Sequence, residues 1–222
     1  MPTRLLEVIA CSVADAVAAQ RGGAHRLEIV RDLDVGGLTP PLALVRDIMA
    51  AVTIPVRVMV RDNAGFTVSG DEEIESLCKA AGEFAALGVD GIVLGFLQGR
   101  ELDLPLTQRI LRHAPSVHAT FHRAFEELAA PEDAIAAFKT VPQIDRILIS
   151  GPPDHLDRLA RIAAPEIRIL AGGGVTPELI RTLIASTTIR EFHVGRAARL
   201  GHDIRQNVDA ERVRALVGLI VG

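Results

Sequence analysis

The sequence contains no tryptophan and no tyrosine, and seven phenylalanines are its only residues of the Phe, Trp and Tyr class. So few rings leave little surface on which nucleic acid bases could stack. The formal net charge is −4, and the basic residues are scattered along the chain with no basic block. A basic patch is the usual electrostatic signature of a nucleic-acid-binding protein. We therefore expect no nucleic acid partner.

Cysteine and lysine are scarce too. Cys11 and Cys78 are the only cysteines, and two thiols provide neither a disulfide framework nor, alone, a four-ligand zinc site. The only lysines, Lys79 and Lys139, lie in segments with a helical pattern, so no lysine is evident for a Schiff base.

No hydrophobic run reaches the roughly 18 residues of a membrane span, and the N-terminus lacks a signal peptide. We expect a cytoplasmic protein that does not bind membranes.

Short runs of β-branched residues alternate with longer amphipathic segments along all 222 residues. The period-2 runs predict eight strands, at 5–11, 26–30, 55–61, 91–97, 117–123, 146–150, 167–173 and 191–196. Period-3.6 patterns predict eight helices, at 12–23, 41–52, 71–88, 105–114, 131–141, 154–164, 176–186 and 209–222. Ser12, Ser69 and Thr176 stand where helix N-caps are expected.

Strict alternation of strands and helices predicts parallel strands joined by right-handed crossovers. Eight such units in a chain of this length fit a compact (β/α)8 TIM-type barrel, and we interpret residues 1–222 as a single domain. A doubly wound open sheet is the alternative. It is less favoured because no G-x-G-x-x-G motif follows the first strand; Gly22 and Gly23 come after a helix.

Polar residues occupy every second position of several predicted strands. His118, Thr120 and His122 alternate with hydrophobic residues, and other strands repeat the pattern with Arg57, Met59, Arg61; Arg146, Leu148, Ser150; and Glu191, His193, Gly195. Alternate residues of a barrel strand face the lumen, and the others face the helices. Because the hydrophobic set suits the helix side, the polar set is predicted to line the lumen, together with Glu7 and Glu28.

Barrel active sites lie at the C-terminal ends of the strands. There we expect His122 to act as a general acid or base, its pKa raised by nearby carboxylates, with Glu7 or Glu28 assisting it. Arg61 and Arg123 are candidates to hold an anionic substrate. For residues lower on their strands, Arg57, Glu191 and His118, we favour structural ion pairs that close the barrel floor.

A phosphate seat is predicted where the last two strands end. Gly172, Gly173 and Gly174 follow a strand and precede a helix, and Gly195 with Arg196 follow the next strand. In TIM-type barrels the loops after strands seven and eight are a frequent phosphate site. Ser150 ends the preceding strand and is a further candidate to contact the anion. The alternative is that the three glycines only permit a tight turn.

The motifs taken together resemble the CutC copper homeostasis family over nearly the whole chain. The resemblance rests on LLEV at 5–8, GGAHRLEI at 22–29, GGLTP at 36–40, TFHRAFE at 120–126, RILISG at 146–151, AGGGV at 171–175 and EFH at 191–193. It implies a cytoplasmic TIM-type barrel, often a homodimer, associated with copper tolerance and copper(I) binding.

Two positions that hold cysteine in proposed copper(I)-binding relatives are occupied by other residues in this chain. Family members proposed to hold copper(I) carry cysteines where this chain has Ile9 and Val30. Copper(I) prefers thiolate or thioether ligands. Cys11 is then the one weak candidate metal ligand, with no methionine evident near it.

Two hypotheses therefore remain open at this point. The first is a metal-binding or copper homeostasis protein. The second is an enzyme, a lyase or an isomerase, that acts on a small phosphorylated or carboxylated metabolite. Either would use the polar pocket at the C-terminal ends of the strands.

Overall fold

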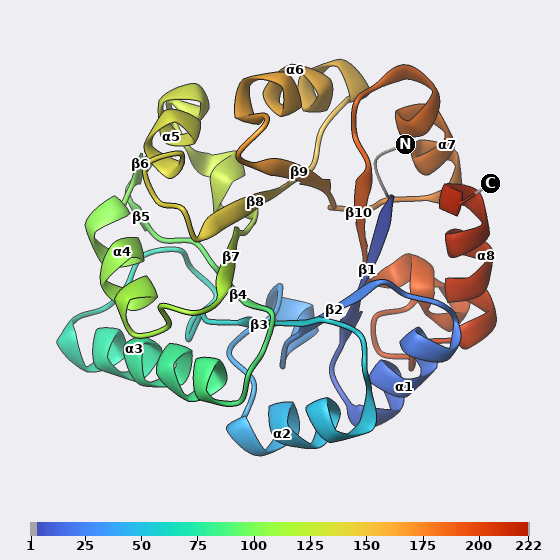
Figure 1. Ribbon diagram of the computed structural model, residues 1–222, viewed down its shortest axis with the longest axis horizontal. Helices are drawn as coiled ribbons and strands as arrows, with labels where there is room; N and C mark the ends of the chain where they lie inside the picture. The colour runs from blue at the N-terminus through green and yellow to red at the C-terminus, as the bar shows by residue number, and fades with distance from the viewer. Residues whose placement is uncertain (1–3, 222) are drawn as a thin grey trace.

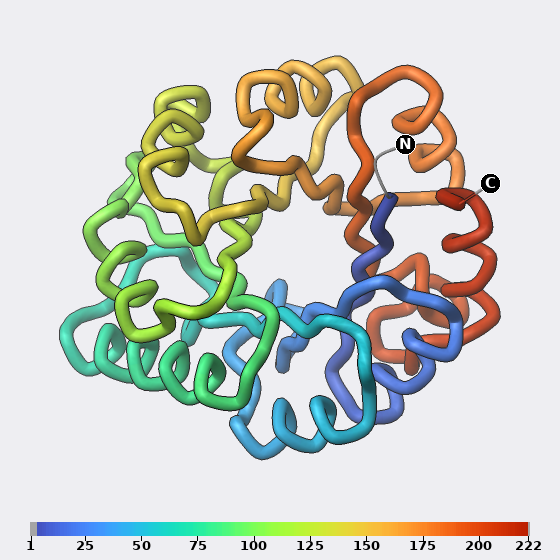
Figure 2. Tube along the Cα trace, in the orientation of Figure 1, coloured from blue at the N-terminus to red at the C-terminus, as the bar shows by residue number. Residues whose placement is uncertain are grey.

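A computed structural model describes residues 4–221 as a closed barrel of parallel strands surrounded by a ring of helices (Figures 1 and 2). Around the barrel the strands follow the order β1-β10-β9-β8-β7-β4-β3-β2. Each strand pairs with its two neighbours, and β1 closes the ring against β10 through Glu7 and His193. The (β/α)8 prediction is confirmed, and the open doubly wound sheet is excluded.

The barrel strands are β1 (Leu5–Ala10), β2 (Arg26–Ile29), β3 (Val56–Met59), β4 (Gly91–Leu94), β7 (His118–Phe121), β8 (Ile144–Ile149), β9 (Arg168–Ala171) and β10 (Glu191–Val194). The α-helices are α1 (Val13–Arg21), α2 (Leu42–Ala51), α3 (Asp71–Ala86), α4 (Leu104–Arg112), α5 (Pro131–Phe138), α6 (Pro153–Ala163), α7 (Pro177–Ser186) and α8 (Ala210–Val221). Short 3-10 helices are η1 (Leu33–Val35), η2 (Arg123–Glu127), η3 (Arg196–Ala198) and η4 (Leu200–His202).

The alternation of side chains along the strands is as predicted. Leu6, Val8 and Ala10 of β1 are fully buried in the large core between barrel and helices. Glu7 and Ile9, on the other face of the same strand, lie in the lumen. The hydrophobic outer layer thus orders the strands, and the inner face is left free to carry polar groups.

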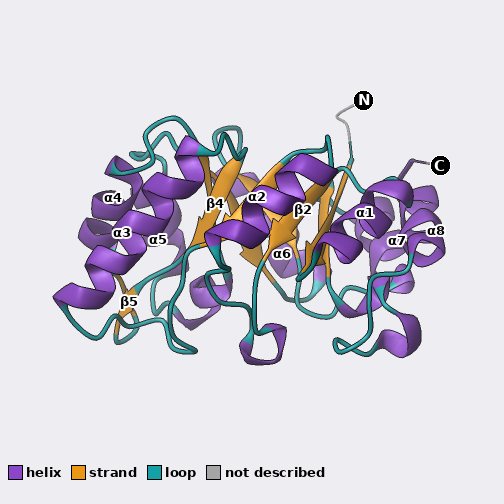
Figure 3. Cartoon of the chain, turned by 90° about the horizontal axis from the view of Figure 1, so that it is seen from below, coloured by secondary structure: helices purple, strands orange, loops and turns teal. Residues whose placement is uncertain are grey.

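Several barrel strands end earlier than the sequence pattern indicates. β3 stops at Met59 and β7 at Phe121, so Arg61 and His122 lie in the loops that follow. A short hairpin, β5 (Leu97–Gln98) and β6 (Glu101–Leu102), was not predicted and lies between β4 and α4, at the lower edge in Figure 3. Because these strands end early, Arg61 and His122 lie at the rim of the barrel mouth and not within the strands.

Helix caps agree with the sequence in part. Ser12 accepts a hydrogen bond from the Asp15 amide, and Thr176 accepts one from the Leu179 amide, so both cap their helices. Ser69 is not a cap, because the N-cap position of α3 is Gly70.

None of the helices within residues 4–221 is long and hydrophobic enough to cross a membrane.

Candidate functional site

A cavity of about 700 Å³ opens at the C-terminal ends of the barrel strands, and we call it the upper cavity. Its polar lining residues include Glu28 and His193 from the barrel strands, and His122, Arg61, Arg123 and Arg196 from the segments that follow strands. The hydrophobic part of the wall comes from Ile9, Val30, Leu33, Val35, Met59, Phe66, Leu148, Val175, Ala197 and Ile204. The volume suits a small metabolite.

His122 follows β7 and turns its ring into the upper cavity. Its Nδ1 accepts a hydrogen bond of 3.1 Å from the Ala124 amide, so a neutral ring carries its proton on Nε2. Nε2 is buried and has no partner among residues 4–221. Gly95 makes this close packing possible, because a Cβ there would lie 2.5 Å from the ring.

The expectation that carboxylates raise the pKa of His122 is wrong. Burial, with the nearby charge of Arg61, lowers the pKa of His122 to about 3. The ring is therefore neutral at physiological pH and presents an Nε2–H donor to the cavity. Such a group stabilises negative charge on a ligand oxygen better than it accepts a proton.

Glu28, on β2, is the buried acid of the upper cavity. One carboxylate oxygen lies 3.3 Å from His193 Nε2, and the other, Oε1, has no partner among residues 4–221. Burial and the charge of Glu7 outweigh the attraction of His193 and raise the pKa of Glu28 to about 7. A carboxyl that titrates near neutrality can take up or release a proton at physiological pH.

Glu7 lies behind this acid and is firmly ionised. Its Oε1 is 2.8 Å from His193 Nδ1, and its Oε2 accepts a hydrogen bond from Arg26. Burial opposes its ionisation, but Arg26 and His193 hold the pKa of Glu7 well below its usual range. In turn, although burial disfavours its charge, Glu28 and Glu7 raise the pKa of His193. Glu7 therefore orients His193 and does not line the upper cavity.

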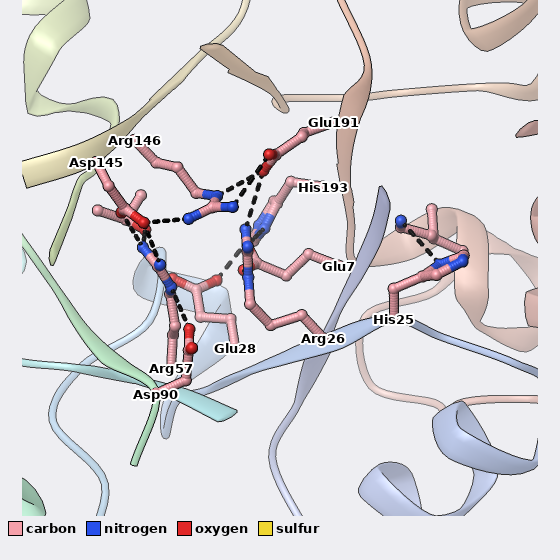
Figure 4. A network of polar contacts seen from close by, with 12 residues as sticks. Glu7, His25, Arg26, Glu28, Arg57, Asp90, Asp145, Arg146, Glu191 and His193 are labelled. Carbon is pink, nitrogen blue, oxygen red and sulfur yellow. Dashed lines mark hydrogen bonds and ion pairs between the residues drawn. The ribbon is translucent and has the colours of Figure 1, made fainter. Parts of the chain in front are cut away.

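Ion pairs close the barrel floor (Figure 4). Arg57 is fully buried and donates hydrogen bonds of 2.7 and 2.8 Å to Asp145 and one of 3.0 Å to Asp90. Glu191 accepts hydrogen bonds from both Nε and Nη2 of Arg146. Each of these buried charges has a partner, so the structural interpretation of Arg57 and Glu191 is confirmed.

His118 differs from that interpretation. Its side chain is 58% exposed, and its Nδ1 lies 3.6 Å from Asp145. It lines a second cavity of about 420 Å³ below the floor, which we call the lower cavity. The first position of β7 lies at the open N-terminal end of the barrel, so this side chain reaches solvent instead of closing the floor.

Arg61 holds the rim together. Its guanidinium donates to the carbonyl oxygens of Gly65 at 3.2 Å, Gly37 at 3.3 Å and Gly36 at 3.4 Å, and also to that of Ala64. Most of its donors are thereby engaged with backbone. Although Arg61 lines the upper cavity, its geometry indicates that it fixes two loops in place.

Arg123 and Ser150 also have protein partners. Arg123 forms two hydrogen bonds of 2.8 Å with Glu126. The same carboxylate accepts hydrogen bonds of 2.9 Å from the amide and the hydroxyl of Ser150. Ser150 does not line the upper cavity, whereas Arg123 does. Glu126 was not predicted as a site residue. It neutralises much of the positive charge of Arg123, which was predicted to bind an anion.

The glycine loops converge on one side of the upper cavity. Gly173, Gly174 and Gly195 line it, and their amides donate to no acceptor among residues 4–221. Gly172 does not line the cavity, and its amide is not free, because it donates to the carbonyl oxygen of Ile149 at 3.0 Å and so continues the strand pairing. Gly173 and Gly174 have φ values of +72° and +92°, which favour glycine.

Arg196 follows these glycines and lines the cavity from the exposed rim. Its guanidinium forms no hydrogen bond or ion pair within the described residues 4–221. Of the arginines predicted to bind an anion, Arg196 is therefore the one whose charge stays available. The structure brings it together with Gly173, Gly174 and Gly195, as the sequence indicated.

Cys11 lies beside the site but not in it. It packs against the cluster of Ile9, Val30, Met59 and Val93, so a methionine is nearer than the sequence suggested. Burial raises the pKa of Cys11 to about 11 despite Arg199, whose Nη2 is 4.0 Å from Sγ. The thiol stays protonated at neutral pH, and the adjacent guanidinium repels a metal cation.

Glu7, Glu28 and His193 offer donor atoms within 4.8 Å of one another, a spacing that metal ligands also show. Both nitrogens of His193 already face carboxylate oxygens. Arg26 adds a further positive charge against Glu7. The three side chains thus have protein partners, and none of the donors is a sulfur.

Fold and site define a class: a (β/α)8 barrel with a cavity lined in part by polar residues at its C-terminal mouth. The chain belongs to the CutC family, whose model matches residues 4–198. It is 34% identical to a CutC family protein of Xanthomonas campestris pv. campestris, over 97% of this chain and 98% of that one. A CutC family protein of Porphyromonas gingivalis is 32% identical, over 96% of this chain and 87% of its own length.

Solved structures agree with this assignment. A CutC protein of Streptococcus agalactiae, named as a candidate copper homeostasis protein, superposes with a TM-score of 0.80 at 25% identity. The match covers 86% of this chain and 98% of that one. A phosphoribosyl anthranilate isomerase of Thermococcus kodakaraensis has a TM-score of 0.64 at 17% identity, over 98% of this chain and 99% of the other, and shows the shared fold alone.

Proposed function

We propose that this CutC family protein binds a small anionic metabolite in the upper cavity. The observation that carries the proposal is the pair of buried atoms, His122 Nε2 and Glu28 Oε1, that line the cavity without a partner among residues 4–221. A buried polar atom left unpaired costs about 1–3 kcal/mol, so a ligand that pairs with both is strongly favoured.

The anionic group of the ligand would sit at the glycine loops. Gly173, Gly174 and Gly195 offer free amides there, and Arg196 offers an unpaired positive charge. Amides directed at one point form a good phosphate or carboxylate site, as in other barrels of this type. Arg123 lies beside them, since a Cβ on Gly173 would be 3.5 Å from its Nε.

Copper(I) fits the residues of this site poorly. The family name associates relatives with copper, but Ile9 and Val30 are aliphatic, Cys11 is protonated, and the acids and His193 are paired with each other. Copper(I) prefers soft sulfur ligands, and Met59 is the one sulfur-containing residue that lines the cavity within residues 4–221. We therefore propose no copper(I) step. The homodimer implied by the family resemblance stays a prediction.

A binding measurement with inorganic phosphate tests the anion seat. We expect phosphate to raise the melting temperature of the protein in a saturable way, since a ligand stabilises the folded state that it binds. Arg196→Ala is expected to weaken phosphate binding about tenfold, because one hydrogen bond to a charged group is lost.

Arg181→Ala is the matched control, because Arg181 is an exposed arginine on α7 that does not line the cavity. It is expected to bind phosphate as the unmodified protein does. If phosphate does not bind, or if both variants weaken binding equally, the anion seat is wrong.

A further inference from the structure

We propose that the upper cavity enolises a phosphorylated α-hydroxy carbonyl compound, with Glu28 as the base and His122 as the donor to the carbonyl oxygen. The inference rests on the proposed function, since the anion seat would hold the phosphate. It adds a reaction to the binding site and assigns separate roles to the two unpartnered groups.

The two groups face the cavity from different walls. Glu28 belongs to β2 and His122 follows β7, and β3 and β4 lie between these strands around the barrel. Both residues are almost fully buried, at 2% and 3% exposed, yet both line the cavity. A flat carbonyl compound between them would have a base beside its α carbon and a donor beside its oxygen.

The surroundings of Glu28 suit a base. His193 lies against one oxygen at 3.3 Å and leaves Oε1 free to reach a ligand. Glu7 and Arg26 fix His193 from behind. With a pKa of about 7, Glu28 is ionised in an adequate fraction at neutral pH and is basic enough to remove a proton from a carbon acid.

The surroundings of His122 suit a neutral donor. The Ala124 amide occupies Nδ1 and fixes the tautomer with the proton on Nε2. The phenyl ring of Phe66, 5.2 Å away between centroids, and the ring of Phe121 limit its movement. A fixed donor stabilises the negative charge that develops on an enolate oxygen.

The step balances without a further reactant. The α C–H bond breaks, its proton passes to Glu28 Oε1, and the electron pair moves to the carbonyl oxygen. That oxygen becomes an enolate oxygen and accepts the hydrogen bond from His122 Nε2–H. The hydroxyl proton then passes to the former carbonyl oxygen, and return of the proton from Glu28 to the former carbonyl carbon gives the isomeric carbonyl compound.

A Schiff-base route does not compete with this step. Lys79 lies on α3 and Lys139 follows α5, and neither lines the upper cavity. The rest of the cavity wall holds no lysine or cysteine that could form a covalent intermediate with a carbonyl. Acid–base chemistry by the two groups is what the residues support.

Exchange of carbon-bound hydrogen tests the inference. The protein is incubated in D2O with dihydroxyacetone phosphate or ribulose 5-phosphate, and loss of the α C–H signal is followed by NMR. We expect exchange catalysed by the unmodified protein, slowed at least about 100-fold in Glu28→Gln and about 10-fold or more in His122→Gln. Binding of the same compounds is measured in parallel by calorimetry and is expected to change less than about threefold in Glu28→Gln.

The outcomes separate the two proposals. Binding without exchange overturns the enolisation and leaves the anion-binding function intact. No binding of either compound overturns both. Equal exchange rates in the unmodified protein and in Glu28→Gln point to a contaminating enzyme and also overturn the inference. A Glu72→Gln variant, which changes an exposed acid on α3, is expected to exchange and bind normally.

Discussion

Arg57→Met lowers the free energy of unfolding by about 3 kcal/mol, which is the largest stability effect that we expect from a single substitution in the barrel. Arg57 is fully buried and holds Asp145, Asp90 and the hydroxyl of Thr120. Methionine fills a similar volume but leaves the acids without their partner. Asp145 and Asp90 are 21% and 32% exposed, so water offsets part of the loss and the value falls at the low end of the range for buried pairs.

Urea unfolding at neutral pH measures this difference. Arg168→Met is the matched control, because Arg168 pairs with Glu191 at 3.2 Å but is 66% exposed. An ion pair of that kind contributes less than about 1 kcal/mol. Equal losses in the two variants would show that the floor network does not stabilise the barrel as its burial indicates.

The unfolding free energy of Glu28→Gln, relative to that of the unmodified protein, increases as the pH rises. The pKa of Glu28 is about 7 in the folded protein against a usual 4.5, so the folded state keeps a proton that the unfolded state releases. The stability of the unmodified protein therefore falls as the pH rises from about 4.5 through 7. Glutamine has no proton to lose, and its advantage is expected to grow by about 2 kcal/mol between pH 5 and pH 8.

The measurement is the unfolding free energy of both proteins at several pH values. Glu7 acts with the opposite sign, because its lowered pKa supplies stability at neutral pH that is lost on acidification. Glu7 is present in both proteins, so subtracting the two curves isolates Glu28 and its effect on His193. A difference that stays constant from pH 5 to pH 8 would contradict the raised pKa of Glu28.

The fold could be predicted because its signal is repeated. Every unit shows a period-2 strand followed by a period-3.6 helix, and the hydrophobic face of each strand, such as Val56 and Val58 of β3, becomes the outer core. Strand ends were less certain. Met59 and Phe121 end their strands early because the chain must turn there to form the rim, and periodicity carries no information on that turn.

The site could be predicted only as a set of residues facing one space. Alternation placed Glu28, His122 and His193 in the lumen, but it could not show which charges pair across the barrel. The pattern did not single out Arg26 or Arg168 as partners of the acids, although Arg26 has the same strand parity as Glu28. Glu126, which engages Arg123, lies in η2, where no period applies.

The pKa of His122 shows the same limit. The sequence places acids on the lumenal face, which suggested a raised pKa, whereas the charge that acts most on the ring is that of Arg61, and the acids lie near His193. Distances between strands decide the sign of such a shift. A sequence pattern names the groups but not these distances.

The central claim is that His122 presents a neutral Nε2–H to a ligand in the upper cavity. Its most direct test is the 15N NMR signal of the His122 ring, followed between pH 5 and pH 8 and during a titration with ribulose 5-phosphate. We predict a neutral ring protonated on Nε2 throughout this pH range, with an Nε2 signal that moves saturably as the compound binds. A ring that becomes an imidazolium at pH 6, or a signal that does not move while the compound binds, would contradict the claim.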